Sequence, residues 1–132
     1  MEQRIINCIR AEQLVHDEMF GLDHEEVWAL FLSSGAKFLA KEMIAKGTLT
    51  SVSIDSFTIL RRALLNNSSN IVLFHNHPSG DPTPSLKDIY WTDKIREACK
   101  IMRVELFDHI ILGDESFYSF ETEKIYHYGT IK

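Results

Sequence analysis

The sequence predicts an α+β fold, an α/β/α sandwich in which helices flank a single mixed β-sheet. Short apolar runs typical of buried strands alternate along the chain with amphipathic segments of helical spacing. Some strands are joined by tight polar turns and others by helices, which favours a mixed sheet. With 132 residues, 45% of them hydrophobic, the chain is long enough for one core. We therefore expect one domain over residues 1–132, without internal repeats.

The first half of the chain predicts a helix, a strand hairpin and a second helix. The helix over 11–19 ends at Gly21. The run 27–32 is almost wholly apolar, typical of a strand buried on both faces, and a Ser-Ser-Gly turn joins it to a second strand. Asp55 is the expected N-cap of the next helix. The expected ranges are helix 11–19, strand 27–32, strand 37–45 and helix 55–65.

The second half predicts a strand, a rigid loop, the longest helix and a final pair of strands. The loop holds all three prolines of the chain together with Gly80. A Gly-Asp-Glu-Ser turn at 113–116 predicts a hairpin. From Glu121 onward no period is evident. The expected ranges are strand 70–74, loop 75–84, helix 85–102, strand 104–112 and strand 117–120.

Composition excludes several classes of protein. Fourteen basic and nineteen acidic side chains give a net charge of −5, which argues against a dedicated nucleic-acid coat. No apolar run approaches the roughly 18 residues of a membrane span, so we expect no membrane association. Cys8 and Cys99 lack metal-ligand spacing and fit the reducing cytoplasm. With six histidines in the chain, a metal site should therefore use His and carboxylate ligands.

One segment combines such ligands. At the end of an extended strand, residues i and i+2 point to one side, so His75 and His77 can converge on one point. Ser85 and Asp88 are three residues apart and share the first turn of the next helix. Two imidazoles and one carboxylate supply three ligands of a tetrahedral zinc and leave the fourth position open, the arrangement of a catalytic site.

Each half of this pattern also has a structural explanation. Ser85-x-x-Asp88 is a helix capping box with Asp in place of Glu or Gln. A lone H-x-H arises by chance in about a quarter of shuffled chains of this composition. The conjunction is far rarer, and capping and ligation can coexist in one segment.

The string H-x-H, seven residues, S, two residues, D is the JAMM (MPN-plus) metalloprotease signature. The stretch from His75 to Ser85 is similar to the JAB domain of the bacterial RadC family, which implies a JAB/MPN, cytidine-deaminase-like architecture. The resemblance covers roughly residues 23–121. It extends to Glu25-Glu26-Val27 with Leu30-Phe31-Leu32, to Gly47-Thr48-Leu49, and to the run from Asp108 and His109 through Asp114.

This resemblance implies roles for matching residues. His75, His77 and Asp88 would bind one Zn²⁺ per chain, although Mn, Fe or Co could use the same ligands. Glu26 would be the general acid/base, and Ser85 the oxyanion donor. The implied reaction is hydrolysis of a peptide or isopeptide bond in a protein or peptide substrate. Glu25 competes with Glu26, because neighbouring strand residues face opposite sides and only one can reach the site.

Two alternatives remain beside the hydrolase. A RadC-like DNA repair or DNA-transaction factor, either a metal-dependent nuclease or a non-catalytic protein, is suggested by the family name and by the basic stripe Arg96, Lys100 and Arg103. The better interpretation of that stripe is a solvated face that forms salt bridges with Asp93 and Glu97. About twenty residues precede the first core strand, so we expect no helix-hairpin-helix region of the kind that RadC proteins commonly carry. The third interpretation is a non-catalytic scaffold of the same fold.

His109 has two interpretations. It follows Asp108 and precedes an apolar run, so it can lie near the metal or serve as a hydrogen-bonded structural histidine.

Overall fold

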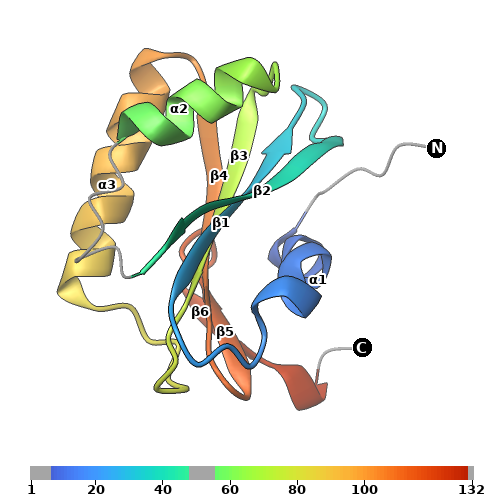
Figure 1. Cartoon of the computed structure of the whole chain (residues 1–132), viewed down its shortest axis with the longest axis vertical. Coiled ribbons are helices and arrows are strands. Elements are labelled where there is room, and N and C mark those ends of the chain that lie inside the picture. Colours follow the sequence, from blue (N-terminus) through green and yellow to red (C-terminus); the bar gives the residue numbers. More distant parts are fainter. Residues whose placement is uncertain (1–6, 48–55, 131–132) are drawn as a thin grey trace.

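A computed structural model describes residues 7–47 and 56–130 of the chain. Three α-helices and six strands account for most of these residues, and a short 3₁₀ helix follows the last strand (Figure 1). The elements are α1 (Cys8–Met19), β1 (Glu26–Leu32), β2 (Phe38–Lys46), α2 (Ser56–Leu65), β3 (Asn70–Asn76), α3 (Leu86–Ile101), β4 (Glu105–Leu112), β5 (Ser116–Ser119), β6 (Lys124–His127) and η1 (Tyr128–Thr130).

The strands form one mixed sheet in the order β2-β1-β3-β4-β5-β6. Only β3 and β4 pair in parallel, because α3 crosses between them, whereas every other neighbouring pair is antiparallel. Helices α2 and α3 cover one face of the sheet and α1 covers the other (Figure 1). The predicted α+β sandwich with a mixed sheet is therefore confirmed.

Alternation along the central strands divides the core into two clusters. On the α2/α3 face, Ala29 and Phe31 of β1 pack with Leu73 of β3 and with apolar residues of both helices. On the α1 face, Leu30 of β1 and Phe74 of β3 pack with α1 and β5. Both faces of β1 and β3 are buried, as the apolar runs predicted.

Most element boundaries lie within a few residues of the prediction. Helix α1 begins three residues earlier than expected, because the side chain of Asn7 accepts a hydrogen bond from the backbone N–H of Arg10 and caps the helix. Strand β6 was not predicted, since its residues have no clear alternation and three of the four are exposed. The expected N-cap Asp55 and the matched residues Thr48 and Leu49 lie outside the described residues.

No helix among the described residues is long and apolar enough to cross a membrane.

Candidate metal centre

Strand β3 delivers two histidines to the same side of the sheet. His75 is paired with Val27 of β1 and Ile111 of β4, so its backbone is fixed on both sides. His77 lies just beyond the strand end, but its N–H donates to the carbonyl of Leu112 at 2.9 Å and prolongs the extended conformation. The two rings therefore point to the same face, and their centroids are 4.9 Å apart.

The proline-rich loop after β3 holds the second ring. The Nδ1 of His77 lies 2.9 Å from the carbonyl oxygen of Asp81. A carbonyl only accepts, so this Nδ1 carries the proton and the Nε2 of the neutral ring has a free lone pair. The loop packs closely on the turn after β4, where a Cβ on Gly113 would collide with the carbonyl oxygen of Gly80. Glycine at 113 therefore permits the approach that places the loop.

Helix α3 supplies the carboxylate through its capping box. The Ser85 hydroxyl accepts from the Asp88 N–H at 3.1 Å, and the Asp88 carboxylate accepts from the Ser85 N–H at 2.8 Å. The capping-box interpretation of this segment is therefore confirmed. The cap fixes Asp88 on the first turn, where it is 5% exposed and faces the two histidines.

His75, His77 and Asp88 form a compact donor set that could hold a metal ion. The two Nε2 atoms are 3.1 Å apart, and each lies 3.2 Å from one oxygen of the Asp88 carboxylate. Tetrahedral zinc with bonds of about 2.0–2.1 Å separates its ligand atoms by about 3.3 Å. The donor types and their spacing therefore fit such an ion, with one coordination position left for water or substrate.

Electrostatics in this group favour a carboxylate beside imidazoles. Burial raises the pKa of Asp88, but the adjacent imidazoles of His75 and His77 outweigh it and hold that pKa well below its usual value. Burial lowers the pKa of His77, but Asp88 and the Asp81 carbonyl outweigh it and raise that pKa overall. The site thus attracts positive charge.

His109 contacts His75 at the ring nitrogen that does not face the donor set. Its Nε2 is 2.7 Å from the Nδ1 of His75, and its Nδ1 is 2.6 Å from the hydroxyl of Thr92. Thr92, which was not predicted from the sequence as a site residue, is buried on α3 one turn after Asp88. The i, i+4 spacing from a ligand would have been the signal. Phe120 stacks on the His109 ring at 4.8 Å, and burial holds the pKa of His109 well below its usual value.

Glu26 does not reach this donor set, contrary to the expectation that made it the acid/base. Its carboxylate accepts from Trp28 Nε1 at 2.9 Å and lies 2.7 Å from His24 Nε2, while its N–H donates to the side chain of Asn76. Trp28 packs in the cluster on the α1 face. Alternation therefore places Glu26 on the face of the sheet opposite the candidate metal site, because Val27 is the residue paired with His75.

Glu25, the alternative acid, lies on the face of the sheet that carries the two histidines. Continuing the antiparallel register beyond Val27 and His75 places Glu25 opposite His77 on the α3 face. The carbonyl of Glu25 accepts from Gly47, so its backbone still follows the sheet. The negative charge of Glu25 also contributes to the raised pKa of His77.

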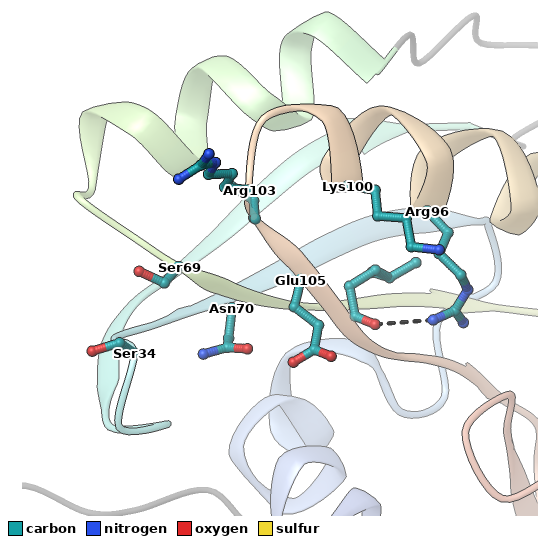
Figure 2. A pocket seen from close by; sticks show the side chains of 9 residues that line it. Ser34, Ser69, Asn70, Arg96, Lys100, Arg103 and Glu105 are labelled. Atoms are coloured by element: carbon teal, nitrogen blue, oxygen red, sulfur yellow. Dashed lines mark hydrogen bonds between the residues drawn. The ribbon is translucent and has the colours of Figure 1, made fainter.

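The basic stripe lies at the other end of α3 and lines a cavity of about 600 Å³ between the helix end and the start of β4 (Figure 2). The expected pairing with Asp93 and Glu97 is wrong. Within residues 7–47 and 56–130, the structure has no ion pair that involves Arg96, Lys100 or Arg103. Instead, Arg96 donates to the carbonyl of Leu106 at 3.2 Å.

Comparison with known proteins agrees with this architecture. Residues 6–125 match the family described as the RadC-like JAB domain. The chain is 40% identical over 116 residues to a UPF0758 protein of Desulforudis audaxviator, covering 88% of this chain and 50% of the relative. It is 34% identical over 123 residues to a UPF0758 protein of Enterococcus faecalis, covering 93% and 53%. The chain thus spans about half the length of the curated relatives it matches. Fold, donor set and sequence together show that the chain belongs to the RadC-like JAB domain family.

Proposed function

We propose that this domain is a zinc-dependent hydrolase that cleaves a peptide or isopeptide bond. The observation that carries the proposal is the convergence of His75, His77 and Asp88 within hydrogen-bonding range of one another. A bound divalent metal would polarise the scissile carbonyl and acidify water at the fourth coordination position.

The chain's own residues would handle the protons and the developing charge. We assign the acid/base role to Glu25, which would accept a proton from the attacking water and return it to the leaving amine. Ser85 would donate its hydroxyl hydrogen to the developing oxyanion, because its oxygen already accepts from Asp88 and its side chain is exposed. Capping uses the Ser85 oxygen as an acceptor, and donation to the oxyanion would use its hydroxyl hydrogen.

A cleavage assay tests this proposal. Protein stripped with a chelator and reloaded with one equivalent of zinc should cleave members of a mixed peptide library that includes Lys-ε-linked isopeptides. Mass spectrometry would locate the scissile bond. The stripped protein should be inactive and regain activity with zinc. Equal cleavage by stripped and reloaded samples would refute the proposed metal-dependent hydrolysis.

A second candidate function is binding of a nucleic acid, as in a DNA-transaction factor. It is favoured by the cations at the end of α3, which line a cavity without carboxylate partners among the described residues (Figure 2). Glu105 lies in the same cavity, and the chain carries a net charge of −5, so the expected affinity is modest.

Salt dependence tests this second function. Labelled single-stranded and branched DNA should bind at low salt, with an affinity that falls steeply as salt rises. Replacement of Arg96, Lys100 and Arg103 by Gln should weaken binding and flatten the salt slope by up to about three. Absence of binding at micromolar protein would refute this function.

We also propose a cytoplasmic location. Cys8 and Cys99 are buried, free thiols, and burial raises the pKa of Cys99 to about 11. Such thiols suit a reducing compartment. Thiol titration of denatured protein purified without reductant should give two free thiols per chain, and fewer would contradict this assignment.

A further inference from the structure

A buried hydrogen-bond relay connects two of the candidate ligands behind the metal centre. It runs from the backbone carbonyl of Asp88 to the hydroxyl of Thr92 at 2.7 Å, then to His109 at 2.6 Å, and from His109 to His75 at 2.7 Å. Thr92 and His109 are each 2% exposed. The relay therefore begins on one ligand residue and ends on another, and bulk water does not compete with its bonds.

The direction of the relay follows from what each atom can donate. The carbonyl of Asp88 only accepts, so Thr92 donates its single hydroxyl hydrogen there. The Thr92 oxygen can then only accept from His109, which requires the proton of His109 on Nδ1. A neutral His109 has no proton on Nε2, and this atom accepts from the Nδ1–H of His75.

We propose that Thr92 and His109 are positioning residues that hold His75 in the tautomer protonated on Nδ1, so that its Nε2 lone pair is available to the metal. This inference rests on the proposed metal centre. The opposite direction would leave the Thr92 oxygen 2.7 Å from the Asp88 carbonyl without a proton between them. It would also place the proton of a neutral His75 on Nε2, the atom that must bind the metal.

His77 achieves the same tautomer by a local contact, since its Nδ1 donates to the Asp81 carbonyl in the adjoining loop. His75 lies inside the sheet, where the neighbouring backbone groups are paired with β1 and β4. It therefore depends on side chains from α3 and β4. Stacking of Phe120 on His109, with an interplanar angle of 5°, fixes the orientation of the intermediate ring.

Substitution of Thr92 tests the relay without touching a ligand. Thr92→Val keeps the shape but removes the acceptor of His109, which should then protonate on Nε2 and force His75 into the wrong tautomer. We expect the zinc dissociation constant of the Thr92→Val variant to rise about 10- to 100-fold. Competition with a chromophoric chelator measures this constant. Thr92→Ser, which keeps the hydroxyl, should restore most of the affinity.

Ser68→Ala is the matched control. Ser68 is a buried hydroxyl with bonds to Leu32 and Asn70 at the far end of β3, so its loss should lower stability and leave zinc affinity within about twofold. Unchanged zinc affinity in a folded Thr92→Val variant would overturn the relay. Failure of the wild-type protein to bind zinc would instead overturn the proposed function.

The tautomer can also be read in the wild-type protein, which does not depend on any variant folding. Two-bond ¹H–¹⁵N correlation spectra should show His109 protonated on Nδ1 and unprotonated on Nε2. Protonation of His109 on Nε2 would overturn the proposal regardless of the binding data.

Discussion

At the end of the sheet where β1 begins and β3 ends, the two faces carry different polar side chains. On the α2/α3 face, the last side chains are His75, His77 and, across from them, Glu25. On the α1 face, the corresponding positions are Glu26 and Asn76, which bond to each other and to their neighbours. Residues adjacent in sequence therefore lie in different chemical environments. A one-residue change of register would exchange a candidate catalytic acid for a structural one.

The polar groups on the two faces also differ in their hydrogen-bond partners. The Glu26 carboxylate accepts from Trp28 and contacts His24, and Asn76 bridges the Glu26 N–H and the His24 carbonyl. These bonds fasten the start of β1 to β3. On the other face, two imidazole nitrogens and a carboxylate lie close together. The polar groups on the α1 face have hydrogen-bond partners within the protein, whereas the group on the α3 face could hold a metal ion.

The largest expected difference between the faces is catalytic. Glu25→Gln should lower peptide cleavage by about 10²- to 10⁴-fold, because it removes the general acid/base, while zinc content stays near one per chain. Glu26→Gln is the matched control on the opposite face and should keep most of the activity. Turnover rates and zinc content of the two variants check this. The reverse ranking would return the acid/base role to Glu26.

The next largest expected difference between the faces is in zinc affinity. His77→Ala should raise the zinc dissociation constant by at least about 100-fold, more than loss of a supporting residue costs, because it removes a ligand. Asn76→Ala should leave that constant within about twofold but lower the free energy of unfolding by about 1–3 kcal/mol, since it leaves the Glu26 N–H without its acceptor. Chelator competition and urea unfolding measure the two effects. Full zinc retention in His77→Ala would remove this residue from the centre.

The smallest expected effect is a pH dependence that arises on the α1 face. Burial raises the pKa of Glu26, but hydrogen bonds from Trp28 and His24 outweigh it and lower that pKa. The pKa of His24 is raised, chiefly by Asp23 and then by Glu26. A lowered carboxyl pKa stabilises the fold above about pH 4.3, and a raised imidazole pKa stabilises it below about pH 6.5.

Glu26→Gln should therefore lose most stability relative to wild type between about pH 4.5 and 6.5, and the two proteins should converge as the pH falls through the folded pKa of Glu26. Urea unfolding across pH 3–8, on metal-free samples, checks this. A difference that grows steadily toward acid would contradict it.

The sequence was sufficient for the elements and for the donor set. Apolar runs and turn residues predicted most of the strands and helices, because strands buried on both faces require continuous apolar sequence. His75, His77 and Asp88 could be grouped because each lies beside a local signal: a strand end, a proline-rich loop and a capping box. Strand β6 was not predicted, because an exposed edge strand lacks a continuous apolar run.

Contacts between elements that are distant in sequence determine which of the two adjacent glutamates faces the donor set and which residues support it. Alternation says that Glu25 and Glu26 face opposite sides, but the side that meets α3 depends on pairing with a strand about fifty residues away. The relay through Thr92 and His109 likewise joins α3, β4 and β3, which no local period connects. Local sequence determines what an element is, whereas contacts between elements determine what its side chains meet.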